Sequence, residues 1–477
     1  MKYSLSLFFL CIGFLVHSQT PVSPLPDSNQ LKWQNRPFYL FIHFGPNTFT
    51  DLEWGKGSEK EEIFNPSALD CRQWCRIAKA AGATGIVITA KHHDGFCLWP
   101  SAYSKHTVAK SSWRKGKGDV LRELSAACRE YDLSMGVYLS PWDRNHPAYG
   151  TPAYNQVFIN MMKEVVRNYG PFFEFWWDGA NGEGPNGKKQ AYDWHAFESA
   201  IREIAPNTLV FSDIGPDIRW TGNENGIAGS TNWNLLDTAG FSRGIGAPPN
   251  DTLNQGNVSG ANWIPMECDV SIRPGWFYHI KEDSLVKTPE KLFDIYLKSI
   301  GRGANLILNV PPDTRGLITS YDSAALLGFA ALCKESFKND LIITEKAFIY
   351  MDGKDLTSSF VNDDEIRYDS AMKSKRIQPF SENRYLDIYF RKKQSVNCIA
   401  LKEPLRYGQS VKSFTVELYD GDLLSYHKMY STIGHLRLIS FPLRQCNRIR
   451  IRIKDAKADP TIEDISVYRI PEELAEK

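Results

Sequence analysis

The chain has 477 residues, more than one hydrophobic core of ordinary size holds, so at least two domains are expected. Its 56 Lys and Arg residues balance 55 Asp and Glu residues, which excludes the strong overall charge of proteins that bind nucleic acid or anionic membranes and suits a neutral substrate. Aromatic residues make up 13% of the chain, including 13 Trp, and those outside the cores favour flat apolar surfaces in a binding cleft.

The N-terminal segment has the pattern of a signal peptide. A positive charge at Lys2 precedes an apolar run from Leu5 to Val16, and Ser18 ends the expected cleavage site. We therefore expect removal of residues 1–18 and a secreted or periplasmic protein. Cys11 is not followed by a lipoprotein-like pattern, which predicts soluble release. The apolar run is too short to span a bilayer, and no later segment predicts a span.

From Phe38 to about Val310, strand-like apolar runs alternate with segments of helical period, which indicates repeated βα units around a parallel sheet. A closed (β/α)8 barrel over residues 19–338 is the preferred fold, and a doubly wound open sheet is the alternative. The seven predicted strands are Phe38 to Phe44, Thr84 to Ala90, Ser134 to Leu139, Phe172 to Trp177, Thr208 to Phe211, Trp263 to Cys268 and Asn305 to Val310. The stretch from Gly215 to Gly260 is expected to hide an eighth. The predicted helices are Arg72 to Ala81, Val120 to Tyr131, Gln156 to Tyr169, Trp194 to Ile204 and Pro289 to Ile300.

After a helix from Ser323 to Phe337, the pattern changes to short alternating strands, which predicts an antiparallel β-sandwich over residues 339–477. The boundary is expected near Lys338, and Asp420-Gly421 is one of the predicted turns. The predicted strands include Tyr385 to Phe390, Ser413 to Leu418, His435 to Phe441 and Arg448 to Ile453.

Eight cysteines beyond the N-terminal segment form no CxxC pair, which argues against a structural zinc site. A dense disulfide framework is not expected in so long a chain, and buried unpaired thiols are the alternative. They are Cys71, Cys75, Cys97, Cys128, Cys268, Cys333, Cys398 and Cys446.

The strongest indication of chemistry is the hydrophobic segment from Phe172 to Trp177, which ends abruptly in Asp178 and a glycine. A carboxylate at the C-terminal end of a barrel strand lies at the barrel mouth, although an isolated Asp there could equally cap a loop. Other predicted strand ends carry residues suited to a polyhydroxylated ring and thereby favour a functional Asp178. These are His43, His92, His93, Tyr138 and Glu267.

Three aromatic residues near these strand ends, Trp54, Trp176 and Phe96, are suited to pack against the apolar face of a sugar. Metal ligation by the histidines is the weaker alternative, because adjacent strand residues such as His92 and His93 tend to point to opposite faces. The sequence also contains no HExxH or HxH spacing. Neither a metal nor another cofactor is therefore expected.

Five motifs carry a family resemblance: Phe-Ile-His-Phe-Gly at 41–45, Glu53-Trp54, Lys-His-His-Asp-Gly-Phe-Cys-Leu-Trp at 91–99, Gly-Val-Tyr-Leu-Ser at 136–140 and Phe-Trp-Trp-Asp-Gly at 175–179. In this order they resemble the α-L-fucosidases of glycoside hydrolase family 29, over about residues 30 to 340. The resemblance implies that Asp178 is the catalytic nucleophile. It also implies a fucose pocket formed by His43, Glu53, Trp54, His92, His93 and Tyr138.

The segment from Arg219 to Gly226 resembles the branch of this family that prefers α-1,3 and α-1,4 linkages in branched, Lewis-type glycans, which implies that Glu224 is the general acid/base. Glu267 is the competing carboxylate, whose other role would be to bind a sugar hydroxyl or a pocket arginine such as Arg273. Trp276 is a further candidate for the pocket wall, with a core position as its alternative.

The resemblance implies an exo-acting, retaining hydrolase of fucosylated oligosaccharides or glycoprotein glycans that needs no cofactor. The balance of charges adds the expectation that the protein binds no nucleic acid. A fucosidase of broader specificity, a non-catalytic fucose-binding protein and a metal-dependent hydrolase are the alternatives. The C-terminal sandwich resembles galactose-binding-like, discoidin-type modules, and a structural role is preferred for it over glycan binding. The sequence leaves the oligomeric state open.

Overall fold

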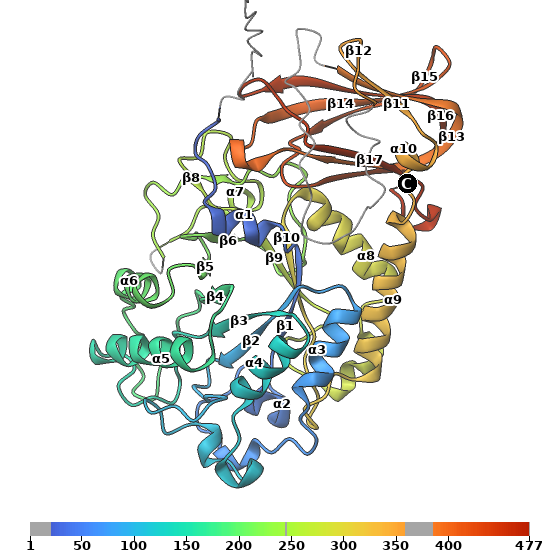
Figure 1. Cartoon of the computed structure of the whole chain (residues 1–477). Helices are drawn as coiled ribbons and strands as arrows, with labels where there is room; N and C mark the ends of the chain where they lie inside the picture. Colours follow the sequence, from blue (N-terminus) through green and yellow to red (C-terminus); the bar gives the residue numbers. More distant parts are fainter. Residues whose placement is uncertain (1–20, 244–245, 358–384, 477) are drawn as a thin grey trace, which may run out of the picture.

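The computed structural model describes residues 21–243, 246–357 and 385–476. The predicted signal peptide, residues 1–18, lies outside the described residues. Figure 1 shows two parts, a barrel surrounded by helices and a smaller antiparallel sheet domain. Within the described part of the chain, no helix has both the length and the apolar character needed to cross a membrane.

Eight parallel strands close into a barrel, which confirms the predicted fold and excludes the open sheet. Their order around the barrel is β1-β10-β9-β6-β5-β4-β3-β2. Alternate residues of each strand face inward and outward. Tyr39 and Phe41 of β1 belong to the inner core, for example, whereas Leu40 and Ile42 pack against the surrounding helices. The strands are β1 (Phe38–Ile42), β2 (Gly85–Lys91), β3 (Ser134–Leu139), β4 (Glu174–Trp176), β5 (Leu209–Ser212), β6 (Ile218–Trp220), β9 (Met266–Ser271) and β10 (Asn305–Asn309).

Six long helices cover the outside of the barrel near their predicted positions. They are α3 (Cys71–Ala80), α4 (Val120–Glu130), α5 (Ala153–Tyr169), α6 (Trp194–Ile204), α8 (Pro289–Lys298) and α9 (Ser320–Phe337). Five of them begin after a side chain that accepts a hydrogen bond from a first-turn N–H, which stabilises the helix start. These caps are Asp70, Asp119, Asp193, Thr288 and Thr319. The shorter helices are α1 (Ser28–Gln34), α2 (Pro46–Thr50), α7 (Asn250–Gln255) and α10 (Leu341–Thr344).

The eighth strand, β6, lies in the Gly/Asn-rich stretch where it was expected, followed by β7 (Leu235–Leu236) and α7. The prediction of one strand from Trp263 to Cys268 is wrong. Strand β8 (Asn262–Trp263) pairs with β7, the chain is interrupted at Pro265, and β9 runs on to Ser271. Proline cannot donate to a strand ladder, which explains the interruption. Glu267 is therefore the second residue of its strand and not a strand end.

The C-terminal domain is antiparallel, as predicted. Its strands are β11 (Phe348–Met351), β12 (Lys354–Asp355), β13 (Tyr385–Lys402), β14 (Val411–Asp420), β15 (Leu423–Ser431), β16 (Arg437–Ala456) and β17 (Asp464–Tyr468). Two segments predicted as separate strands are the two halves of β16. The register between β13 and β16 shifts near Tyr389, and both halves of each strand contribute to one shared core.

The sandwich packs against α8 and α9, as Figure 1 shows. The rings of Phe337 and Tyr468 lie 5.3 Å apart at this contact. Gln409 of the sandwich accepts a hydrogen bond from the backbone of Asn234 at 2.8 Å and donates one to the carbonyl of Asn232 at 2.8 Å. Both bonds are buried and tie the sandwich to the segment that follows β6. The eight cysteines are free thiols, and all but Cys333 are buried.

Candidate active site

Five of the predicted side chains meet at one end of the barrel. His43 follows β1, His92 and His93 follow β2, Tyr138 is the penultimate residue of β3, and Asp178 lies two residues beyond β4. These four strands are neighbours in the barrel. The ring centroids of His43 and His92 are 5.8 Å apart, and the ring of His92 stacks on Tyr138 at 5.8 Å.

Both oxygens of the Asp178 carboxylate are oriented by donors. Tyr138 donates its hydroxyl hydrogen to Oδ2 at 2.9 Å, and the backbone N–H of Ala180 donates to Oδ1 at 2.7 Å. Burial, followed by the charge of Asp178, raises the pKa of Tyr138 well above its usual value, so the phenol keeps its proton. The side chain of Asp178 is 25% exposed, which leaves it open to a ligand at the mouth.

The tautomer of His43 follows from its hydrogen bonds. Asn309, the last residue of β10, donates from Nδ2 to Ser271 Oγ and to the Trp276 carbonyl at 2.9 and 2.8 Å, so its Oδ1 is free to accept. His43 Nδ1 lies 2.8 Å from that oxygen and must carry the proton. Burial lowers the pKa of His43 to about 3, so the ring is neutral and its Nε2 has a free lone pair.

His93 is held in the same tautomer. Its Nδ1 is 2.8 Å from Ser140 Oγ, whose own hydrogen is donated to the Trp142 carbonyl, so His93 Nδ1 is the donor. Burial lowers the pKa of His93 to about 4, although the charge of Asp178 opposes the shift. The unprotonated Nε2 then lies 3.6 Å from Asp178 Oδ2. A ligand hydroxyl group that lies within hydrogen-bonding distance of both acceptors can donate to either of them.

The expectation that His92 and His93 face opposite ways is wrong. Both residues lie beyond the end of β2, where strand alternation no longer applies, and their ring centroids are only 4.1 Å apart. Burial lowers the pKa of His92 well below its usual value, and no described residue bonds its Nδ1. Among the described residues, no three His, Cys, Asp or Glu side chains are grouped so that they could hold a metal ion.

Two tryptophans flank the histidines. Trp54 is 57% exposed and meets the ring of His93 edge-on at 5.7 Å, whereas the ring of Trp276 lies 5.1 Å from His43. Trp142, which the sequence did not single out, packs against His93 at 4.8 Å. Its position three residues beyond the end of β3 was the available signal. These residues give the site apolar walls on both sides of the polar groups.

Two other predicted aromatic residues lie deeper. Trp176 stacks on Phe211 with a centroid separation of 4.1 Å and donates its indole N–H into the barrel, so it forms the floor beneath Tyr138. Phe96 is buried against Phe64 at 5.2 Å and belongs to the core outside the barrel. The expectation that Phe96 contacts a ligand is therefore wrong.

Glu53 supports the loop after β9. Its carboxylate accepts hydrogen bonds from the backbone N–H groups of Trp276 and Phe277 at 2.8 and 3.1 Å, and it lies 2.7 Å from His279 Nε2. In the described structure, all hydrogen bonds of the Glu53 carboxylate go to this loop. Glu53 thus positions Trp276, whereas the sequence predicted a direct contact with the ligand.

Glu224 lies four residues beyond β6 and is exposed. The indole N–H of Trp276 points to its Oε2 at 3.4 Å, so Glu224 stands at the rim next to the aromatic wall. Its charge also contributes, after burial, to raising the pKa of Asp269 well above the usual value. A loosely held, exposed carboxyl group of this kind is free to reorient.

Glu267, the competing carboxylate, lies in the closed interior of the barrel. It accepts hydrogen bonds from Tyr39 and, at 2.9 Å, from the indole of Trp176, and it neighbours Glu174. Burial, then the charge of Glu174, raises the pKa of Glu267 well above its usual value. Its placement at the mouth was therefore predicted wrongly.

Arg273, the suggested partner of Glu267, is also elsewhere. It is buried and pairs with Asp322 at 2.7 Å and with Asp283 at 2.8 Å. The pair with Asp322 links the end of β9 to α9 and places no guanidinium in the pocket.

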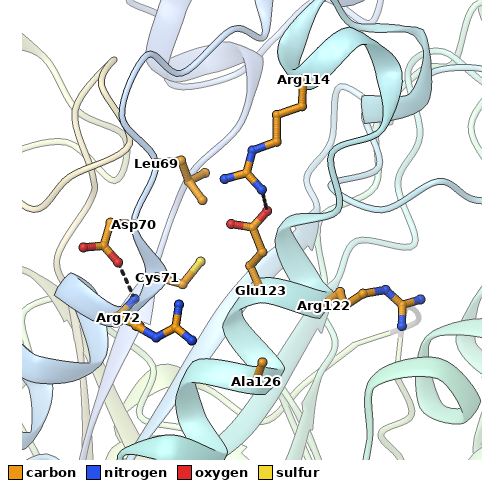
Figure 2. Close-up of a pocket in the computed structure, with 8 residues that line it drawn as sticks. All are labelled: Leu69, Asp70, Cys71, Arg72, Arg114, Arg122, Glu123 and Ala126. Atoms are coloured by element: carbon orange, nitrogen blue, oxygen red, sulfur yellow. Dashed lines mark hydrogen bonds and ion pairs between the residues drawn. The ribbon is translucent and has the colours of Figure 1, made fainter.

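A cavity of about 370 Å³ between the first turns of α3 and α4 is separate from these residues (Figure 2). Three arginines line it, but each is paired with a carboxylate of the chain itself: Arg72 with Glu130, Arg114 with Glu123 and Arg122 with Asp119. None of the predicted site residues lines this cavity.

Known proteins similar to this chain are described as alpha-L-fucosidases or as members of glycoside hydrolase family 29. Residues 20–335 match the family model described as alpha-L-fucosidase. Alpha-L-fucosidase 1 of Arabidopsis thaliana is 37% identical, with 98% of this chain and 94% of that protein aligned. A crystal structure of a glycoside hydrolase 29 family member from an unknown rumen bacterium has 39% identity and a TM-score of 0.82, covering 95% of this chain and 78% of that one. A Ruminococcus gnavus GH29 fucosidase in complex with fucose has 28% identity and a TM-score of 0.86, covering 96% and 97%.

Proposed function

Because this chain belongs to the α-L-fucosidase family of glycoside hydrolases, family 29, and is thereby an enzyme that hydrolyses fucosides, we propose that it is exo-acting and retaining and removes terminal α-1,3- or α-1,4-linked L-fucose from branched glycans. Fucosylated oligosaccharides and glycoprotein glycans are the proposed substrates. The observation that carries the proposal is Asp178, a carboxylate with both oxygens oriented, beside three buried histidines at the barrel mouth.

The charge state of the histidines supports an uncharged, hydroxyl-rich ligand. Their lowered pKa values make them neutral at physiological pH, so they attract no anion. The free Nε2 lone pairs of His43 and His93 accept hydrogen bonds from hydroxyl groups, while Trp54 and Trp276 offer apolar surfaces. This combination suits a 6-deoxy sugar, which has both hydroxyl groups and a methyl group.

In the proposed mechanism Asp178 attacks the anomeric carbon as the bond to the leaving oxygen breaks, and Glu224 gives its proton to that oxygen. Glu224 then takes a proton from water, the water oxygen attacks the same carbon, and the ester to Asp178 breaks. Two inversions give net retention, and this mechanism requires carboxyl groups about 5 Å apart. The exposed and weakly held Glu224 is free to serve the leaving oxygen and the water in turn.

The linkage preference is supported by the sequence from Arg219 to Gly226, which includes Glu224. A broader preference within the same family is the competing possibility. Release of fucose from a panel of α-1,2-, α-1,3-, α-1,4- and α-1,6-linked oligosaccharides decides between them, and equal rates on all four would disprove the narrow preference.

The mechanism predicts different effects for the two carboxyl groups. Asp178→Ala should abolish turnover, because no other group can form the ester. Glu224→Ala should lose about 10²- to 10⁴-fold on natural glycans, lose less on an aryl fucoside with a good leaving group, and recover partly with azide. Kinetics on both substrate types, with NMR of the first anomer released, provide the measurement. Initial release of β-fucose would contradict retention.

Export is also proposed, on the signal-peptide pattern of residues 1–18. The protein should be found in the periplasm or the medium, with cleavage after Ser18. N-terminal sequencing of the mature protein tests the site, and a cytoplasmic full-length product would contradict the proposal.

A further inference from the structure

We propose that Asp213 is a specificity-determining residue that accepts a hydrogen bond from a hydroxyl group of the sugar to which the fucose is attached, so that the enzyme favours oligosaccharides over simple fucosides. This inference rests on the proposed function and extends it to the leaving-group side of the site. Neither the strand-end pattern nor the family motifs pointed to Asp213.

Asp213 is the first residue after β5, at the same end of the barrel as the pocket. In the barrel order, β5 lies between β4, which carries Asp178, and β6, which carries Glu224. The bond to be broken must lie between those two carboxyl groups. The strand order therefore places Asp213 beside the part of the site that must bind the leaving sugar.

The contact with Gly179 shows where the Asp213 carboxylate lies. A Cβ atom built on Gly179 would stand 2.5 Å from Asp213 Oδ2 and 2.8 Å from Oδ1. Both oxygens therefore face the residue that follows the nucleophile. A glycine is needed there because any side chain would displace the carboxylate.

This carboxylate has an unused capacity to accept hydrogen bonds. Among the described residues, the backbone N–H of Asp213 itself donates to its carboxylate, but no other residue supplies a donor, although the side chain is partly buried. Burial, and then the charge of Asp178, raises its pKa to about 6. A partly buried carboxylate whose only donor is its own backbone N–H is incompletely satisfied, and a ligand hydroxyl group that supplies a second donor reduces this penalty.

The fucose ring has other partners. His43, His92, His93 and Tyr138 come from β1 to β3, on the far side of Asp178 from β5. They are enough to engage the hydroxyl groups of one monosaccharide. The acceptor on β5 is therefore assigned to the next sugar.

The test compares Asp213→Asn with the wild-type enzyme on two substrates, an aryl fucoside without a second sugar and a fucosylated oligosaccharide. We expect kcat/KM for the oligosaccharide to fall about 10-fold or more, as for loss of a hydrogen bond to a charged group, and that for the aryl fucoside to change less than about threefold. Glu183→Gln, which removes an exposed carboxylate from the nearby loop, is the matched control and should change neither value.

Gly179→Ala provides a second variant that leaves Asp213 itself in place. Its new methyl group should push the carboxylate away and produce the same selective loss. Equal losses on both substrates, or no loss on either, would overturn the inference, because Asp213 would then act on Asp178 or on nothing. A wild-type enzyme inactive on both substrates would instead refute the proposed function.

Discussion

The buried amide of Asn309 determines what His43 offers to a ligand. It fixes the proton on Nδ1 and thereby leaves Nε2 as an acceptor. Ser140 does the same for His93 through a hydroxyl group. In both cases a fully buried residue behind the histidine fixes its tautomer and thereby selects the hydroxyl orientation that the pocket accepts.

This arrangement predicts the effect of Asn309→Asp. A carboxylate in place of the amide stabilises the imidazolium form, so the pKa of His43 should rise from about 3. As pH falls through the new value, His43 Nε2 becomes a donor and kcat/KM for an aryl fucoside should fall with it. NMR titration of the ring measures the pKa. Asn305→Asp, at the other end of β10, is the control, and an unchanged His43 pKa would contradict the assignment.

Single residues also show what the sequence could reveal. Asp178, Tyr138 and the histidines stand next to strong strand signals, so their common location could be predicted. The partners of Glu53 could not be predicted in this way, because they lie more than 200 positions away. Asp213 also follows a strand, but no local pattern encodes its approach to Gly179.

The loop from Arg273 to His279 is the element that Glu53 controls. Glu53→Gln keeps one acceptor but turns an NH₂ group toward N–H donors, so the loop should loosen and Trp276 should lose its position. We expect KM to rise and kcat/KM to fall about tenfold. Asp51→Asn, which removes only the negative charge of the other partner of His279, should have a smaller effect. Faster hydrogen exchange in the loop of the Gln variant provides the structural measurement.

The length of the surrounding apolar run decided which strands the sequence could reveal. Strand β4 has three residues but lies in the apolar run from Phe172 to Trp177, whereas β6 also has three residues and no such run around it. Glu267 was predicted at a strand end because the apolar run continues across Pro265. This proline in fact separates β8 and β9, which belong to different sheets. An apolar run shows that a strand exists, but its ends depend on hydrogen bonds to partners elsewhere.

The interior of the barrel predicts a pH dependence of stability. Mainly by burial, the folded state raises the pKa of Glu174 from its ordinary value of 4.5 to about 7, and it raises the pKa of Glu267 well above the same ordinary value. Between about pH 4.5 and 7 the folded state therefore binds more protons than the unfolded state, and the free energy of unfolding falls as pH rises.

Glu267→Gln should reduce this slope, because the amide remains neutral and still accepts from Trp176. Other buried carboxyl groups with raised pKa values, such as Glu403 and Asp340, keep part of the dependence. Urea unfolding at several pH values provides the test. A variant whose slope equals that of the wild-type protein would show that Glu267 does not contribute to the pH dependence.

At the scale of the whole molecule, the sandwich holds the segment of the barrel domain that follows Glu224. Gln409 bonds the chain at Asn232 and Asn234, a few residues after Glu224. This contact supports the preferred structural role of the sandwich, and it connects the second domain to the loop of the proposed acid/base.

Gln409→Ala should therefore have two effects. Loss of the buried hydrogen bonds should reduce the free energy of unfolding by about 1 to 3 kcal/mol. Activity on natural glycans should fall more than activity on an activated aryl fucoside, because only the former depends strongly on proton donation. Gln445→Ala, which changes an exposed bond within the sandwich, is the control. Equal losses on both substrates would argue against a connection to Glu224.

The buried guanidinium of Arg219 fastens both ends of the region that contains Glu224. Arg219 lies within β6, the strand from which that region departs, and it donates to the carbonyl groups of Trp233, Leu253 and Ile264 further along the chain. The rim between these anchors can thus vary in shape without disturbing the barrel. For protein engineering, a library randomised at Asn223 and Asn225 offers a way to retune glycan choice while the scaffold stays constant.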